Sequence, residues 1–380
     1  TGIVHEGAVG YVGDRYVEQK YKGWADLNVD EGTYTAPTGW MGITSRYFFT
    51  GIIPPQGEQT NFSVRYQDVQ NKADKNAQPL YQVDTLAAAR TIAPGAEVSY
   101  ETRFFAGAKK LRVLDTYEQK LGLKHFDLVM DFGWFYFLTK PFYYALVMIN
   151  DLVGNFGVAI LVFTALLRLA VFPLANASFK SFANMKRVQP QIQELQKAYI
   201  SDKRKMQEEL VKLYQKEKVN PLSGCLPILV QIPVFFAMYK VISVSIDMRH
   251  APFFGWIRDL SAPDPTSIIN LFGLLPYDVP SFFHFGIWPT LLFVMIMIQV
   301  RLSPPPPDAM MRIFFSYYYP VVVCFIMAKF AAGLVIYWSF SAFLSITQQI
   351  VIMQMMGVPV HLFERIKAKT KPTAPDKVSS

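Results

Sequence analysis

The sequence predicts an α-helical polytopic membrane protein, in which an extracytoplasmic antiparallel β-sandwich domain precedes a five-helix transmembrane core with a hydrophilic interior. Of its residues, 52% are hydrophobic, 15% aromatic and only 17% charged, which is typical of a membrane protein that carries one polar domain. Residues 1–132 hold 14 Lys or Arg against 16 Asp or Glu, so the net charge of +8 lies in the remainder. A length of 380 residues allows two domains.

Residues 1–118 are predicted to form the β-sandwich domain. Short strand-like runs at 61–66, 80–83 and 97–105 are separated by turns rich in Pro and Gly, a pattern typical of antiparallel sheets. Residues 68–78 are expected to form an exposed loop. The domain has no evident nucleophile, metal-ligand cluster or phosphate-binding loop. The chain starts with Thr and has no signal peptide, so we expect a domain that is incomplete at its start and follows an upstream segment.

A connector at 119–150 follows, and it becomes strongly aromatic from residue 133 onward. Two alternatives fit this stretch: a helix that lies in the membrane interface, or a sixth membrane span. The dense Trp and Tyr, with Lys140 and Pro141 in the middle of the run, favour the interfacial helix. The choice decides the topology, because five spans place the β-domain and the C-terminus on opposite sides of the membrane and six place them on one side.

Five apolar segments within residues 151–358 are predicted to span the bilayer. The first, at 155–177, has 23 residues, and as a helix it is about 34 Å long against a hydrocarbon core of roughly 30 Å. The other four are expected at 222–245, 283–302, 313–329 and 334–355.

A charged insert at 178–220 separates the first two spans and contains 10 basic and 5 acidic residues. Apolar residues recur every three or four positions in both of its halves, so we expect two amphipathic helices paired as a hairpin. The positive-inside rule places this hairpin in the cytoplasm, together with the basic tail at 359–380. The pattern suits a self-packed hairpin and also a docking surface for a ribosome, a targeting factor or a client. The candidate docking residues are Lys186, Arg187, Lys203, Arg204 and Lys205.

Arg168 is the one cation in the first predicted span. An arginine at a helix centre costs about 2.5–3.5 kcal/mol on insertion scales, so Arg168 either snorkels to the interface or faces a wet cavity within the bilayer. The predicted spans contain no Asp or Glu, which argues against a proton relay or a cation pathway. An unpaired cation instead suits an anionic group that binds transiently.

The predicted spans also carry many uncharged polar residues. Each alone is best explained as a contact between helices, but together with Thr164 and Arg168 they predict a wettable interior. These residues are Gln231, Gln299, Ser339, Ser341, Thr347, Gln348, Gln349 and Gln354.

Several motifs in a fixed order resemble the YidC/Oxa/Alb family of membrane protein insertases. They begin with the Arg168 helix and continue with FPL at 172–174, YQKEKVNPL at 214–222, GCLPILVQIPVF at 224–235, PFFGWIRDLS at 252–261 and AGLVIYW at 332–338. The stretches GWMGIT at 39–44 and IIPP at 52–55 look like the latter part of the periplasmic domain of Gram-negative members. The resemblance covers the chain from its start to about residue 359.

The resemblance implies a non-enzymatic insertase and chaperone of the bacterial inner membrane, acting alone or with the Sec translocon. Its implied partners are nascent membrane proteins, the ribosome, the signal recognition particle pathway and membrane lipids, without a cofactor, a metal or a small-molecule substrate. It also implies a hydrophilic groove that is open to the cytoplasm and to lipid and that binds the client. The residues expected to line it are Arg168, Thr164, Tyr337, Trp338, Gln231 and Gln348.

Two positions depart from the family pattern. FAAG at 330–333 replaces a sequence that often contains Pro, which we expect to loosen the turn before the last span. Trp338 stands where the family often has Tyr. We therefore do not expect a hydroxyl contact to the client at this position.

Two other functional classes compete with the insertase. An anion channel or transporter would conduct ions in reconstituted vesicles, but the weak internal repeat common in transporters is not evident. An intramembrane enzyme is disfavoured because the predicted spans contain no Asp or Glu and their serines have no evident base.

Overall fold

The computed structural model describes residues 4–24, 26, 32–67, 79–199, 202–217, 219, 226–277, 279–280, 284–306, 309–358 and 360. The chain divides into two compact units. The first, here the β-unit, comprises Thr1–Lys140 with Ser243–Arg249, and the second, here the helical unit, comprises Pro141–Ile242 with His250–Ser380. The loop expected at 68–78 and the tail from residue 361 lie outside the described residues.

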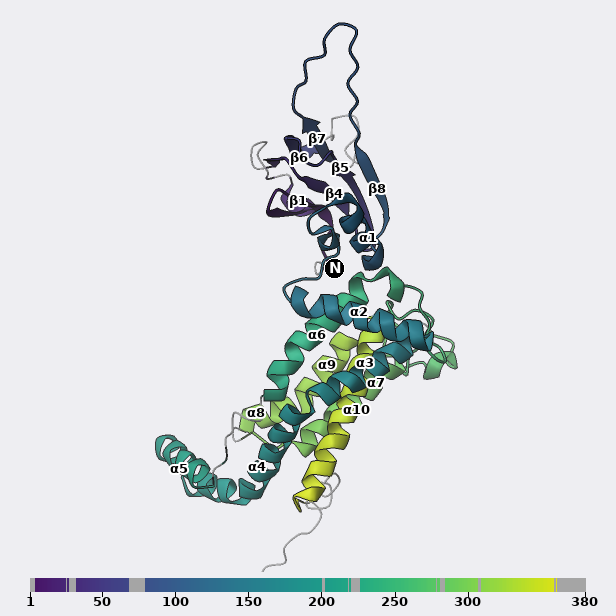
Figure 1. Ribbon diagram of the computed structural model, residues 1–380. Helices are drawn as coiled ribbons and strands as arrows, with labels where there is room; N and C mark the ends of the chain where they lie inside the picture. The colour runs from purple at the N-terminus through teal and green to yellow at the C-terminus, as the bar shows by residue number, and fades with distance from the viewer. Residues whose placement is uncertain are drawn as a thin grey trace, which may run out of the picture. The chain divides into compact units, whose positions relative to one another are not determined.

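The described part of the β-unit contains two antiparallel sheets, which confirms the predicted β-sandwich (Figure 1). One sheet has the strand order β2-β1-β4-β5-β8 and the other the order β3-β6-β7. The strands are β1 Gly7–Val12, β2 Arg15–Lys20, β3 Thr33–Ala36, β4 Gly39–Thr44, β5 Phe48–Ile53, β6 Thr60–Gln67, β7 Leu80–Ala87 and β8 Arg103–Ala108.

The core of the sandwich is built from side chains of the strands together with Trp24, which directly follows the short helix η1, Tyr21–Gly23. Trp24, Met41 and Phe62 are each at most 1% exposed and belong to one cluster. In the larger sheet Gly42 on β4 pairs with Gly51 on β5, and a Cβ at Gly42 would lie only 2.1 Å from the carbonyl oxygen of Thr50. The paired glycines therefore leave the space that the ring of Phe49 fills.

The strand predicted at 97–105 begins later than expected. The strands predicted at 61–66 and 80–83 lie within β6 and β7, but β8 starts only at Arg103. Its partner β5 has six residues, and each of them already pairs with one residue of β8. Residues 97–102 are exposed and carry no strand, because the partner strand ends before them.

The first part of the connector belongs to the β-unit. Helix α1, Leu111–Leu121, and the short helix η2, Phe126–Val129, bury Leu111, Leu114 and Phe126 completely. The Phe126 ring packs edge-on against Trp40 of β4, with their centroids 5.1 Å apart. Because these residues supply part of the β-unit core, the first stretch of the unit continues beyond the expected residue 118 to Lys140.

A buried ion pair closes the end of the β-unit. The carboxylate of Asp127, only 1% exposed, accepts a hydrogen bond from Lys140 Nζ at 2.7 Å. It also accepts one from the hydroxyl of Tyr136, at the start of helix α2, Tyr136–Val153. The pair fixes the first turn of α2 against η2.

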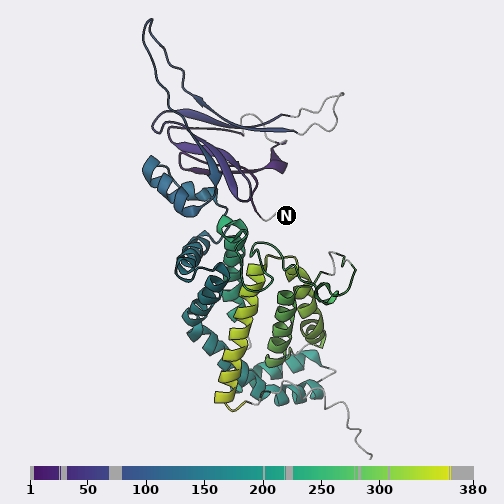
Figure 2. The same cartoon turned by 90° about the vertical axis from the view of Figure 1, so that its right-hand side faces the viewer.

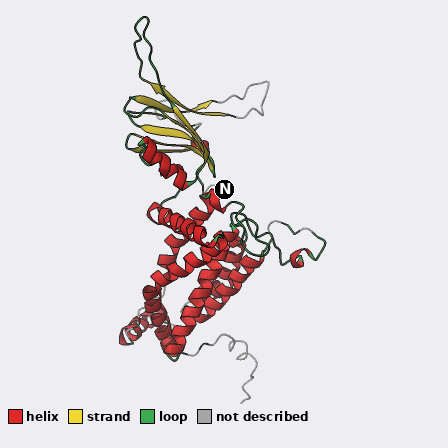
Figure 3. Ribbon diagram, turned by 45° about the vertical axis from the view of Figure 1, so that its right-hand side comes forward, coloured by secondary structure: helices red, strands yellow, loops and turns green. Residues whose placement is uncertain are grey.

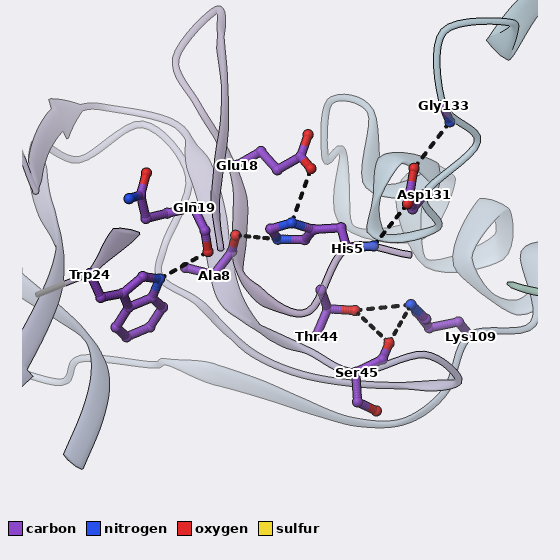
Figure 4. A network of polar contacts seen from close by, with 10 residues as sticks. All are labelled: His5, Ala8, Glu18, Gln19, Trp24, Thr44, Ser45, Lys109, Asp131 and Gly133. Carbon is purple, nitrogen blue, oxygen red and sulfur yellow. Dashed lines mark hydrogen bonds and ion pairs between the residues drawn. The ribbon is translucent and has the colours of Figure 1, made fainter. Parts of the chain in front are cut away.

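A second polar network ties the start of the described chain to the β-unit (Figure 4). The imidazole Nδ1 of His5 lies 3.0 Å from a carboxylate oxygen of Glu18, and its Nε2 lies 2.8 Å from the carbonyl oxygen of Ala8. The backbone N–H of His5 donates to Asp131 at 2.9 Å. The hydrogen bond from His5 lowers the pKa of Glu18 below its ordinary value, against an opposing effect of burial.

Helix α2 is not among the described helices that are long and apolar enough to cross a membrane. The part of α2 within the helical unit runs across one end of the bundle formed by α3, α6, α7, α9 and α10 (Figure 1). Pro141 lies within it. These observations favour the interfacial helix over a sixth span.

The first predicted span is not one straight helix. Helix α3, Phe156–Ala170, and helix α4, Phe172–Ala198, meet at Val171 with a bend of 68°. Pro173 lies in the first turn of α4, where its missing N–H is tolerated, but it lacks the donor needed to continue α3. The expected helix at 155–177 is therefore α3 plus the first turns of a helix that continues into the hairpin.

The remaining spans appear as apolar helices with shifted ends. By length and composition, Met310–Met327 and Ala332–Met355 qualify as spans among the described residues, the bent α3–α4 pair counts as a third, and two apolar helices are shorter. Helix α10 runs the length of the helical unit (Figure 2). The helices are α6 Leu226–Val244, α7 Ile287–Leu302, α8 Ala309–Ile313, the π-helix η7 Phe314–Tyr318, α9 Tyr319–Met327 and α10 Ala332–Met355.

The amphipathic hairpin is confirmed. Helix α5, Lys203–Lys216, packs on the last turns of α4 through a buried cluster that contains Val188, Ile192 and Leu210. Met185, Leu195, Met206, Leu213 and Tyr214, which supply the predicted periodicity, pack against this cluster. Asp202 caps α5 by accepting a hydrogen bond from the backbone N–H of Lys205.

The loop between α6 and α7 caps two helices of the helical unit. One carboxylate oxygen of Asp264 accepts from the backbone N–H of Trp288 in the first turn of α7, and the other accepts from the indole N–H of Trp256. The carbonyl oxygens of Leu260 and Ala262 accept from the first N–H groups of α10. The start of α10 is thus held by backbone hydrogen bonds to this loop, and the looser turn expected from FAAG stays a prediction.

Candidate functional site

Arg168 lies in the last turn of α3, three residues before the bend at Val171. It is half-buried. Because the carbonyl groups at a helix C-terminus carry partial negative charge, a cation is more stable in this last turn than in the middle of the helix. The local structure thus partly compensates for an arginine in an apolar segment.

One hydroxyl accepts two hydrogen bonds from the guanidinium. The Oγ of Ser341, on α10, lies 3.0 Å from Nε and 2.6 Å from Nη2 of Arg168. Ser341 is only 2% exposed. A buried hydroxyl has two acceptor lone pairs, so a single serine can hold both N–H groups of the planar fork.

An amide and a phenol extend this contact to a third helix. The side-chain oxygen of Gln231, on α6, lies 3.4 Å from Nη2 of Arg168, and its amide nitrogen donates to the hydroxyl of Tyr337 at 2.8 Å. Tyr337 is completely buried on α10, one turn before Ser341. We call Arg168, Gln231, Tyr337 and Ser341 the polar cluster.

The polar cluster holds its cation with neutral acceptors. Among the described residues, Arg168 forms no ion pair with a carboxylate. The segments that form α3, α6, α7, α9 and α10 contain no Asp or Glu at all. Ser341 and Gln231 therefore orient the guanidinium and leave its charge unneutralised, which suits an anionic partner that comes and goes.

The structure brings three of the predicted groove residues together and places the other three elsewhere. Arg168, Gln231 and Tyr337 meet in the polar cluster. Thr164 is buried one turn before Arg168, and its hydroxyl donates to the carbonyl of Ile160 on the same helix. Gln348 is seven residues beyond Ser341, hence on the same side of α10, with a buried amide nitrogen that has no partner among the described residues.

Trp338 does not reach the polar cluster. Its ring packs on Phe235 of α6 with the centroids 5.0 Å apart, and it borders a hydrophobic cluster shared by α7, α9 and α10. Adjacent residues on a helix face directions about 100° apart, so Tyr337 and Trp338 do not serve one surface.

Ser341 was named from the sequence among the polar residues of the spans but not among the groove residues. Its four-residue spacing from Tyr337 places both on one face of α10. This spacing was a usable signal, but serine is common in membrane helices as a contact between helices, so its type alone gave no reason to select it.

The five basic residues predicted for docking differ in their surroundings. Arg187 donates a hydrogen bond to the carbonyl of Met356 at the end of α10. Its positive charge there also interacts favourably with the dipole of that helix. Arg204 is 93% exposed, and Lys205 lies over the ring of Tyr199. Lys186 takes part in an interaction within the described structure, and the side chain of Lys203 is outside the described residues.

An open cavity of about 460 Å³ lies between α4 and α5. Its lining combines the apolar side chains of Leu195 and Leu213 with charged ones that include Glu194 and Lys212. A concave surface of mixed character on a helical hairpin suits contact with a protein segment.

The fold and the polar cluster define a class: a polytopic helical membrane protein with an unneutralised arginine among its helices and a β-sandwich domain ahead of them. The chain belongs to the family described as the 60Kd inner membrane protein, whose model matches residues 148–358, while the model of the YidC periplasmic domain matches residues 1–145. The two matches together confirm the predicted order of a β-sandwich domain followed by a helical core.

Two curated relatives illustrate the similarity. The membrane protein insertase YidC of Brucella melitensis is 48% identical over 380 residues, which cover 99% of this chain and 61% of the relative. The protein of the same name from Rhizobium meliloti is 47% identical over 368 residues, covering 96% of this chain and 60% of the relative. The chain thus spans about three-fifths of the length of these relatives.

A solved structure of an active YidC insertase with its first transmembrane domain resolved is 21% identical, with a TM-score of 0.47. The match covers 87% of this chain and 74% of that one.

Proposed function

We propose that this protein is a membrane protein insertase and chaperone of the bacterial inner membrane. It would insert nascent membrane proteins and help them fold, alone or together with the Sec translocon, without catalysing a chemical reaction. The names of the relatives at 48% and 47% identity support the class of function. The β-unit would lie in the periplasm, and the hairpin and the C-terminal tail in the cytoplasm, as the basic residues of both favour.

The observation that carries this proposal is the guanidinium of Arg168, which neutral side chains orient while its charge stays unneutralised. Burial of a client's apolar helix in lipid drives insertion, but moving its polar or acidic flank through hydrocarbon is costly. A hydrophilic groove at the polar cluster, open to the cytoplasm and to lipid, would shorten the apolar path. Arg168 would attract the flank part of the way and release it as the client helix enters the lipid.

The remaining groove residues would act beside Arg168 in different ways. Gln231 and Tyr337 form a hydrogen-bonded pair that links α6 to α10, so they would fix the wall of the groove. Gln348 would extend the polar face of α10 towards its C-terminal end, since its amide nitrogen lacks a partner among the described residues. Thr164 would line the groove one turn before Arg168. Its hydroxyl is bonded to a carbonyl of its own helix, α3, and so would not compete for the guanidinium.

The hairpin would be the docking surface for the delivery machinery. Arg204 and Lys205 stand at the start of α5, and the cavity between α4 and α5 lies on the same hairpin. Exposed cations of this kind suit the phosphate backbone of ribosomal RNA or of the signal recognition particle.

Reconstitution of this chain into liposomes with a single-span client tests the proposal. We expect the client to become protected from external protease in vesicles that contain the chain and not in empty vesicles. Equal protection in both kinds of vesicle would contradict the insertase function. Anion flux through the same vesicles without a client would favour a channel instead.

A further inference from the structure

The loop at residues 267–277, here the apolar loop, exposes hydrophobic side chains although it lies between two helices of the helical unit. Leu274 is 80% exposed, and Leu271 and Phe272 are each more than half exposed. Ile268, Ile269, Leu275 and Tyr277 are also exposed. No charged residue occurs in the sequence between Asp264 and Asp278. Exposed apolar surface without interspersed charge marks an interaction site.

The backbone of the apolar loop forms several hydrogen bonds within the loop. The N–H of Phe272 donates to the carbonyl of Ser267 at 2.9 Å, and the N–H of Leu275 donates to that of Asn270 at 3.1 Å. The hydroxyl of Tyr277 donates to the carbonyl of Ile269. Internal pairing of this kind is what a segment needs where water is scarce, because unpaired backbone groups are costly next to lipid.

Two bulky residues of the apolar loop adopt the left-handed conformation, with φ of 49° at Leu271 and 62° at Phe272. Side chains of this size rarely occupy that region, and such strain persists only where the surroundings enforce it. Here the two residues lie in the short segment η5, Leu271–Gly273, which is kinked at Phe272. The side chains of Leu271, Phe272 and Leu274 are exposed.

The position of the apolar loop identifies its partner. The N–H of Ile268 donates to the carbonyl of Phe285, two residues before α7 begins at Ile287. The base of the loop is therefore at the depth where this apolar helix starts. Figure 3 shows the loop and its short helix standing out to the side of the helix bundle, so a bilayer around the bundle would meet it at its surface.

We propose that the apolar loop anchors the protein in the membrane interface, with Leu271, Phe272 and Leu274 in the boundary between headgroups and acyl chains. The leaflet is the one at the C-terminal end of α6 and the N-terminal end of α7. Irregular backbone does not face hydrocarbon at greater depth, so the loop lies in the interface and does not form a re-entrant span. This inference does not depend on the proposed function, since it concerns only how the helical unit sits in lipid.

Spin-label accessibility in liposomes tests this inference. A single cysteine would replace Leu274 in a full chain whose Cys225 and Cys324 are changed to Ser, and its nitroxide would be probed with oxygen and with a water-soluble nickel chelate. A matched label at Val98, an exposed apolar residue of the β-unit, reports water. A label at Leu166, exposed on α3, reports the acyl chains.

We expect the label at Leu274 to collide more often with oxygen than with the nickel chelate. Its depth should be about 5–10 Å into the boundary, between the values at Val98 and Leu166. Nickel accessibility equal to that at Val98 would overturn the proposal. Protection from both reagents would also overturn it, because it would mean that protein and not lipid covers the loop. Since Leu274 is exposed, the label replaces no core contact, and Leu274→Asp should lower the oxygen collisions of a second label at Ile269.

Discussion

The guanidinium of Arg168 donates two hydrogen bonds to a single hydroxyl, the Oγ of Ser341, at 3.0 Å and 2.6 Å. The contact joins the last turn of α3 to the middle of α10. Since Ser341 is buried and neutral, it positions the cation without cancelling its charge.

Replacing Ser341 should therefore destabilise the helical unit more than replacing a neighbouring serine. We expect Ser341→Ala to cost about 1–3 kcal/mol, because the Nε–H of Arg168 loses its acceptor and Nη2 keeps only the longer contact to Gln231. Ser345→Ala is the matched control, since Ser345 is similarly buried one turn later on α10. Thermal unfolding of both variants in detergent checks this prediction. Equal losses in the two variants would show that the hydroxyl of Ser341 does not hold Arg168.

The cap on α7 makes a second prediction. Asp264→Ala leaves the N–H of Trp288 and the indole N–H of Trp256 without their acceptor, so we expect a loss of at least about 2 kcal/mol. Asp264→Asn keeps one acceptor oxygen and should lose less. Asp259→Ala is the control, because Asp259 bonds to Ser261 in its own turn and beyond it contacts the exposed ring of His250. Unfolding midpoints give the ranking, and a loss for Asp259→Ala as large as for Asp264→Ala would contradict it.

The buried pair at the end of the β-unit makes a third prediction. Asp127→Asn should cost about 3 kcal/mol, the lower end for a broken buried pair, because Lys140 keeps 27% of its side chain exposed. The double variant Asp127→Asn with Lys140→Met should recover part of this loss, since it removes a cation that Asp127→Asn leaves with the more distant carboxylate of Asp115, 4.0 Å away. Chemical unfolding of the single and double variants measures the coupling. Additive losses would mean that the two charges do not stabilise each other.

The pKa of Glu18 gives a prediction for pH. His5 lowers the pKa of this carboxyl in the folded protein, so the folded state binds its proton less tightly than the unfolded state does. The resulting stabilisation is present above the ordinary glutamate pKa of about 4.3 and is lost as pH falls through the lower folded value. Between pH 6 and pH 3, the melting temperature of the β-unit should thus fall less in Glu18→Gln than in the unchanged protein. An identical fall in both proteins would argue against the contact.

Regular periodicity is what made parts of the fold predictable. The hairpin followed from apolar steps that include Val188, Ile192 and Leu210, which the structure buries together. The helix α10 and the sandwich were likewise expected, because hydropathy and turn signals are local properties of the sequence. The strand β8 began late because its length depends on β5, a partner distant in the sequence.

The polar cluster was only partly predictable for the same reason. Arg168 was identifiable from its charge alone and Gln231 from its polarity within an apolar run, whereas Tyr337 was named only through the family resemblance. Which α10 residue meets Arg168 depends on how α3 and α10 are rotated against each other. Ser341 was therefore not singled out from the other polar residues, and Trp338 was selected although it packs on Phe235. The bend at Val171 had a signal in Pro173, but a proline near a helix end predicts either a kink or a stop.

The central claim is that the charge of Arg168 attracts an acidic client flank. The most direct test compares, in liposomes, the insertion of one client with an aspartate flank and of the same client with an asparagine flank. The intact chain should insert the acidic client with a preference that Arg168→Lys partly keeps and Arg168→Ala abolishes. A preference for the acidic flank that is unchanged in Arg168→Ala would contradict the claim.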